Sequence, residues 1–98
     1  MDLLTCAEKI RLKLGEDSSL NAVLKFDCGS DGVIVVDAVQ RPHIVDHLDR
    51  DADCTVSLSL PDLAKLLVGE LNPVMGFMSG QLKLAGDMSI AMRLQKVV

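Results

Sequence analysis

Two histidines near the middle of the chain are spaced as metal ligands often are. His43 and His47 are four residues apart, and Asp46 and Asp49 lie close by. On a helix this spacing would place both imidazoles on one face, where the carboxylates could supply oxygen ligands. Pro42 and the surrounding aspartates favour a solvated loop instead, and the sequence has no H-E-x-x-H motif. We therefore expect inert loop histidines, with no metal and no cofactor.

The cysteines and serines of the chain do not form a recognisable nucleophilic site. Cys28 and Cys54 fall on the apolar phase of alternating segments, which predicts buried structural thiols. Together with Cys6 they make an odd, widely spaced set, typical of reduced cysteines in a cytosolic protein. Ser79 precedes a glycine at the start of a strand-like segment, where serine commonly belongs to a turn, and no G-x-S-x-G motif is present. We therefore expect no catalytic residue and no enzymatic activity.

The charge and hydropathy of the chain argue against several classes of partner. A net charge of −4 and only two aromatic residues are atypical of a protein that binds nucleic acid. No apolar run approaches the roughly 18 residues of a transmembrane segment. The first residues also lack the positive start of a signal peptide. The sequence predicts a cytoplasmic protein whose residues 1–98 form a single domain.

The periodicity of apolar residues predicts the helices and strands that hold these groups. Apolar residues recur at helical spacing before Gly15, and they alternate with polar residues in the strands. The polar, Asp-rich segment 41–53 is predicted to be a connection. The grouping predicts an α+β fold in which helices cover one face of a mostly antiparallel sheet. The expected elements are a helix at 1–14, a hairpin of strands at 20–28 and 33–39, a strand at 54–60, a helix beginning at Pro61 and ending before Asn72, a short helical turn at 75–77, a strand at 80–86 and a helix at 87–98.

The stretch 76–95 carries more apolar surface than a small domain normally buries under one helix. In its predicted helix, only Ser89, Arg93 and Lys96 form a polar stripe, and apolar residues cover the rest. The chain also contains five Met residues, whose flexible side chains can adapt to irregular apolar ligands or can simply fill gaps in the core. This apolar surplus indicates a cavity, a ligand or a protein partner.

One family shares the order and spacing of residues in the second half of the chain. The positions concerned are Cys54-Thr55-Val56-Ser57-Leu58, Asp62, Gly69, Leu71-Asn72-Pro73, Phe77-Met78, Gly80, Leu82-Lys83-Leu84, Gly86-Asp87-Met88, Ala91 and Leu94-Gln95. In these positions the chain resembles the sterol carrier protein 2 domain, an SCP-2-like lipid-binding and lipid-transfer family. It departs from the pattern at Gly76, where the family often has Ala, and at Gln81, where it often has Lys.

The resemblance implies a five-stranded sheet with helices on one face and an internal apolar tunnel between them. Sterols, fatty acids or fatty acyl-CoAs would bind there without chemical conversion. The partners expected are a lipid or another long apolar ligand, with transient membrane-surface or protein contact. An alternative is an accessory subunit of the same fold, which presents lipid to a partner enzyme or docks on it.

Three groups of residues are predicted to bind the ligand. One wall would come from the last part of the chain, the opposing side from the helix after Pro61, and the floor from the hairpin. Gln95 or Arg93 would hold a headgroup at the mouth, although Arg93 also suits plain surface solvation. The predicted residues are Met75, Phe77, Met78, Leu82, Leu84, Met88, Ile90 and Met92 for the wall, Leu63, Leu66 and Leu67 for the opposing side, and Phe26 and Val35 for the floor.

Overall fold

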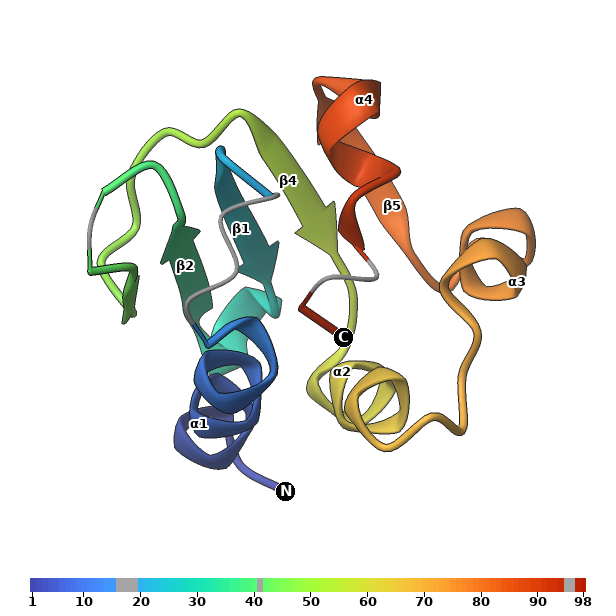
Figure 1. Cartoon of the computed structure of the whole chain (residues 1–98). Coiled ribbons are helices and arrows are strands. Elements are labelled where there is room, and N and C mark those ends of the chain that lie inside the picture. Colours follow the sequence, from blue (N-terminus) through green and yellow to red (C-terminus); the bar gives the residue numbers. More distant parts are fainter. Residues whose placement is uncertain (16–19, 41, 95–96) are drawn as a thin grey trace.

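The computed structural model describes residues 1–15, 20–40, 42–94 and 97–98 (Figure 1). Most of the predicted elements are present, with the first helix, the hairpin and the short helix after Asn72 all confirmed. The elements are α1 (Leu3–Leu14), β1 (Val23–Asp27), a 3-10 turn (Gly29–Asp31), β2 (Val33–Asp37), β3 (Ile44–Asp46), β4 (Cys54–Ser57), α2 (Leu60–Leu67), α3 (Pro73–Met78), β5 (Lys83–Gly86) and α4 (Met88–Ala91).

The five strands form one sheet in the order β3-β2-β1-β4-β5. The central pair β1 and β4 is parallel, with Phe26 opposite Val56, while the other three pairs are antiparallel. The predicted α+β class with a mostly antiparallel five-stranded sheet is therefore confirmed. The parallel pair requires a crossover between its strands, because two parallel strands cannot be joined by a tight turn.

Segment 41–53 was predicted to be a connection. This prediction was wrong in one respect, because the segment contains the edge strand β3. This strand pairs with β2 by placing Val45 opposite Val36. It is three residues long and Val45 alone is buried, so it offers no alternation that a sequence pattern could detect. A short strand of this kind is a common way to end a sheet, because it leaves few unpaired backbone groups at the edge.

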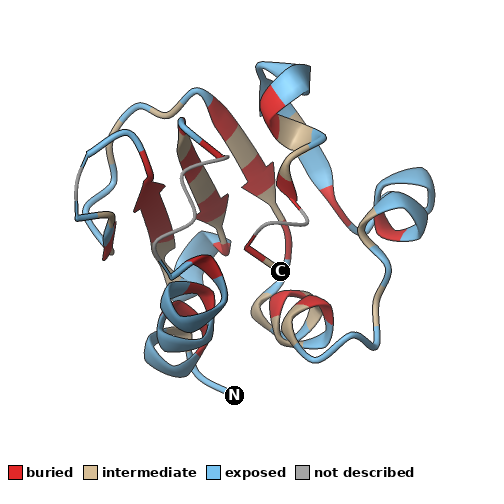
Figure 2. Cartoon of the chain, in the orientation of Figure 1, coloured by how far each residue is buried: buried red, intermediate tan, exposed pale blue. Residues whose placement is uncertain are grey.

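The core lies between one face of the sheet and the helices (Figures 1 and 2). Leu24 and Phe26 point into it from β1, while Ile10 on α1 and Leu63 on α2 meet them from the other side. The start of α1 is capped by Asp2, whose carboxylate accepts the backbone N–H of Thr5 at 2.8 Å. Within the described residues, no helix has the length and hydropathy needed to cross a bilayer.

The opposite face of the sheet is covered by charged side chains. Lys25 of β1 forms an ion pair of 2.9 Å with Asp49, and Asp46 of β3 forms one of 2.9 Å with Arg50. Val35 lies on β2 between these two strands, opposite Lys25 and Asp46 in the register, and is fully buried. Val35 therefore faces away from the helices.

The terminal helix is shorter than predicted, since α4 ends at Ala91 after about one turn. Asp87 caps it as expected, accepting the backbone N–H of Ser89 at 2.9 Å. The chain then turns so that Leu94 and Val97 are both buried in the core. Burial of these two side chains overrides the helical pattern that continues in the sequence. Of the predicted polar stripe, Lys96 lies outside the described residues.

A hydrogen bond from Arg93 links this terminal turn to the segment just before β1. Its guanidinium Nη1 donates a hydrogen bond of 3.0 Å to the carbonyl oxygen of Leu20, just before β1. The backbone N–H of Arg93 donates to the Ile90 carbonyl at 2.9 Å, which tightens the end of α4. The side chain of Arg93 is thus engaged in a structural contact and is not free in solvent. Its role in holding a headgroup stays a prediction.

Candidate functional site

An apolar cavity of about 380 Å³ lies where α3, β5 and α4 meet. Its size is within the range of roughly 300–1,000 Å³ that is usual for small-molecule sites. None of its described lining residues is charged or has a polar side chain. The lining consists of Pro73, Val74, Phe77, Leu82, Leu84, Met88, Ala91, Met92 and Leu94. Such a cavity suits an apolar guest and provides no group for acid–base or nucleophilic chemistry.

The floor of the cavity is formed by β5 because its residues alternate between the two faces of the sheet. Leu82 is buried just before the strand and Leu84 is partly buried within it, while Lys83 and Ala85 are exposed. Leu84 is held in place by pairing with Val56 of β4. The alternation predicted from the sequence is therefore confirmed.

The position of α3 is determined by its cap and by a glycine. Asn72 accepts the backbone N–H of Val74 at 2.9 Å and that of Met75 at 3.4 Å, and Pro73 occupies the first turn, where it needs no N–H partner. Gly76 is buried against Leu82, and a Cβ atom at this position would lie 3.0 Å from the Leu82 Cγ. This close approach leaves Phe77 facing the cavity.

The rim of the cavity exposes large apolar side chains to solvent. Phe77 is 46% exposed, Met88 51% and Met92 84%. Figure 2 shows α3 and much of α4 as mostly exposed, in contrast to the largely buried strands β1, β2 and β4. Apolar side chains gathered at the rim of an apolar cavity are typical of a binding site rather than of an ordinary monomer surface.

Five of the fourteen predicted binding residues line this cavity, namely Phe77, Leu82, Leu84, Met88 and Met92. Phe26, Leu63, Leu66 and Ile90 are instead buried in the core. Their role in ligand binding stays a prediction.

Four further predicted residues do not line the cavity. Met75 and Met78 are exposed on α3, and Leu67 lines a second pocket beside α1. Val35 faces the charged side of the sheet, so it cannot line a cavity that lies between the sheet and the helices. Gln95 lies outside the described residues.

Four lining residues, Pro73, Val74, Ala91 and Leu94, were not predicted, and spacing could have found two of them. Val74 is three residues before Phe77, and Ala91 is three residues after Met88, so each pair shares a helical face. Leu94 reaches the cavity because the chain turns after α4, which the helical pattern did not indicate.

The two histidines flank β3 and are held by backbone carbonyls. The Nδ1 atom of His43 lies 2.9 Å from the carbonyl oxygen of Gln40, and that of His47 lies 3.0 Å from the carbonyl oxygen of Val33. In an extended chain, four residues span about 13 Å, which is too far for two ligands of one ion. The structure shows no cluster of three metal-ligating side chains within its described ranges.

The three cysteines are free and buried. Burial raises the pKa of the Cys28 thiol to about 11, and the neighbouring Cys6 adds to this shift. Burial likewise raises the pKa values of Cys6 and Cys54. Because the thiolate is the reactive form, these thiols are poor nucleophiles at neutral pH.

We expect the cysteines of the folded protein to resist alkylation. Iodoacetamide at pH 7.5 should modify the native chain at least 100-fold more slowly than the urea-unfolded chain, since folding both buries the thiols and keeps them protonated. Raising the pH from 7.5 to 9 should leave alkylation of Cys28 in the native chain slow, because pH 9 is still below the Cys28 pKa of about 11. Mass spectrometry of the modified chain measures both rates. Rapid labelling of Cys28 in the native protein at pH 7.5 would contradict this expectation.

The chain thus has a small α+β fold with an apolar cavity between α3, β5 and α4. The sequence model of the SCP-2 sterol transfer family matches residues 8–98, and the chain belongs to this family. It is 37% identical over 70 residues to the sterol carrier protein 2 of Rattus norvegicus, a match that covers 70% of this chain and 13% of that protein. The chain therefore corresponds to a small part of that much longer relative.

Solved structures share the fold across nearly the whole chain. The crystal structure of sterol carrier protein 2 like 2 from Aedes aegypti superposes with a TM-score of 0.77 at 23% identity, covering 98% of this chain and 95% of that one. The solution structure of the palmitated form of the Aedes protein gives a TM-score of 0.73 at 24% identity, covering 99% and 94%.

Proposed function

We propose that this chain binds lipids and transfers them, without chemical conversion, as a single domain of residues 1–98 in the cytoplasm. The observation that carries the proposal is the cavity between α3, β5 and α4, which is lined by apolar residues and rimmed by exposed methionines. Membership of the SCP-2 sterol transfer family supports the same function.

The ligand class that suits this cavity is a long apolar chain, from a fatty acid, a fatty acyl-CoA or a sterol. The Aedes aegypti protein that shares the fold has been solved in palmitated form, which supports an acyl chain. Each buried methylene contributes about 0.8 kcal/mol, so a partly enclosed acyl chain offsets the entropy lost on binding. Met88 and Met92 can close over the chain, because the thioether side chain adopts many shapes.

Saturable binding of a fluorescent fatty acid is the expected result of the direct test. A palmitate analogue with a terminal fluorophore should bind one site and be displaced by unlabelled palmitate or sterol. Circular dichroism on the same sample shows whether the protein is folded. If a folded sample shows no saturable binding, the carrier function is excluded and the exposed methionines must serve a protein partner, as an accessory subunit would require.

A further inference from the structure

All five methionines of the chain are exposed to solvent, although methionine is among the residue types that folded proteins most often bury. Four of them lie on or directly after the helices α3 and α4, namely Met75, Met78, Met88 and Met92. The described core is filled instead by leucine, isoleucine, valine, alanine, phenylalanine and cysteine side chains. The thioethers are therefore placed where a reagent dissolved in water can reach them.

Two of these methionines line the apolar cavity between α3, β5 and α4. Met88 begins α4 and Met92 directly follows it, and the backbone N–H of Met92 donates to the carbonyl oxygen of Met88 at 3.2 Å. The two side chains are thus one helical turn apart and border the same space. Among the described lining residues, no charged or polar side chain could form a hydrogen bond with a polar group added to either methionine.

The sulfur atoms of this chain fall into two groups of different reactivity. The three cysteines are buried and their thiol pKa values are raised, which keeps them in the unreactive protonated form. A thioether has no proton to lose, so a peroxide can oxidise an exposed methionine at neutral pH. In the folded chain, a peroxide should therefore oxidise the exposed methionines before the cysteines.

We propose that Met88 and Met92 form a modification site at which oxidation by a peroxide weakens lipid binding, an inference that rests on the proposed function. Each thioether sulfur forms a bond to one oxygen of hydrogen peroxide as the O–O bond breaks, so the sulfur loses two electrons and the peroxide is reduced to water. The product is a polar sulfoxide. An apolar chain in the cavity then contacts sulfoxides that have left water without a new hydrogen-bond partner, which lowers the affinity. Methionine sulfoxide reductases regenerate the thioether, so the loss is reversible.

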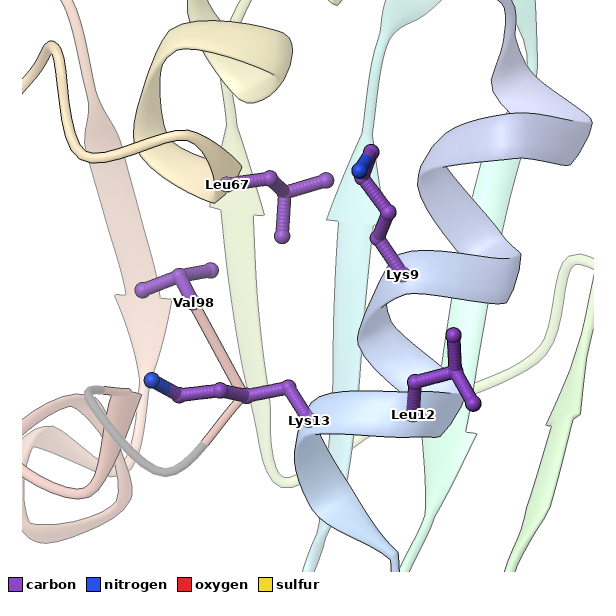
Figure 3. A pocket seen from close by; sticks show the side chains of 5 residues that line it. All are labelled: Lys9, Leu12, Lys13, Leu67 and Val98. Atoms are coloured by element: carbon purple, nitrogen blue, oxygen red, sulfur yellow. The ribbon is translucent and has the colours of Figure 1, made fainter.

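A second pocket, between α1, α2 and the end of the chain, provides an internal comparison. Figure 3 shows its labelled side chains, which are Lys9, Leu12, Lys13, Leu67 and Val98. None of these five side chains contains sulfur, and dilute peroxide leaves them unchanged. A loss of lipid binding after oxidation would therefore report on the cavity between α3, β5 and α4 and not on this pocket.

Treatment of the folded chain with hydrogen peroxide, followed by lipid titration, tests the inference. Peptide mass spectrometry measures the conversion of each methionine to its sulfoxide, and circular dichroism on the same sample shows whether the chain is folded. The oxidised chain should bind the fluorescent palmitate analogue about tenfold more weakly. Incubation with both methionine sulfoxide reductases, one for each sulfoxide epimer, should restore the original affinity.

Two double variants test whether the effect belongs to the cavity. Met88→Leu/Met92→Leu removes the oxidisable sulfur atoms and keeps apolar side chains, so peroxide should change its affinity, whatever the starting value, by less than about twofold. The matched control Met75→Leu/Met78→Leu removes the same number of thioethers from exposed positions that do not line the cavity. Its affinity should fall with peroxide as much as that of the unsubstituted chain.

Three results would overturn this inference alone. Unchanged binding after full oxidation of Met88 and Met92 would exclude the modification as a control of affinity, although the lipid-binding cavity stands. A peroxide response that is lost in Met75→Leu/Met78→Leu and kept in Met88→Leu/Met92→Leu would assign the effect to the outer face of α3. Binding that stays weak after the thioethers are regenerated would assign it to damage elsewhere in the chain. Absence of binding before any peroxide is added would instead refute the proposed function, and this inference with it.

Discussion

The Gly86→Ala variant is expected to lose about 3 kcal/mol of unfolding free energy, the largest stability effect of any change considered for this chain. Gly86 has a backbone φ of 104°, which a residue with a side chain adopts only under strain. A Cβ atom there would also overlap the carbonyl oxygen of Asp53 and lie 3.2 Å from the Cα of Cys54. Both groups are backbone atoms and cannot move aside without disturbing the strand pair β4–β5.

The backbone around Asp53 explains why this disturbance would spread. The carboxylate of Asp53 accepts the backbone N–H of Val23 at 2.9 Å, and its carbonyl oxygen accepts the N–H of Asp87 at 2.8 Å. Asp53 therefore joins the start of β1 to the residue that caps α4. A shift at Gly86 would loosen the strand and the helix that together form much of the cavity.

Gly80→Ala is the matched control for this prediction. Gly80 also has a positive φ, of 84°, but a Cβ atom there would meet nothing within 4 Å. Its substitution should therefore cost only the conformational strain, about 1 kcal/mol. Urea unfolding followed by circular dichroism gives both free energies, and equal losses in the two variants would show that the close contact at Gly86 contributes nothing.

Local sequence patterns determine some elements of this fold, and tertiary contacts determine others. The capped helix α1 and the alternating strands β1 and β4 were predicted because each has a periodic pattern and a clear end, such as Gly15. The edge strand β3 was missed because three residues carry no period. The length of α4 was overestimated because burial of Leu94 and Val97, a tertiary effect, ends the helix.

The candidate site was predictable to the extent that it depends on spacing within one element. Leu82 and Leu84 both line the cavity, because a strand alternates. Met75, Phe77 and Met78 of α3 were all predicted to lie on the wall, and only Phe77 lines this cavity, because the rotation of a short helix depends on its tertiary contact. Gly76 packs against Leu82, which turns Phe77 into the cavity and leaves Met75 and Met78 in solvent. No pattern in the sequence of α3 indicates that contact.

The Met92→Trp variant is expected to bind long-chain lipids at least tenfold more weakly, which corresponds to about 1.4 kcal/mol. Met92 lines the cavity and is 84% exposed, so the indole can lie across the opening with little repacking of the core. For the same reason the unfolding free energy should change by less than about 0.5 kcal/mol. We therefore expect Met92→Trp to lower the affinity without lowering the stability. If Met92 were part of a filled core, the same substitution would instead cost about 1–3 kcal/mol of unfolding free energy through overpacking.

Met78→Trp supplies the matched control, because Met78 is 76% exposed on α3 but does not line the cavity. The same substitution at this position should leave both affinity and stability nearly unchanged. Titration with a fluorescent palmitate analogue and urea unfolding on the same samples give the two quantities for both variants. If Met78→Trp weakens binding as much as Met92→Trp, the ligand covers the outer face of α3 as well, and Met78 is a binding residue as the sequence predicted. If neither variant weakens binding, the apolar cavity between α3, β5 and α4 is not where the lipid lies.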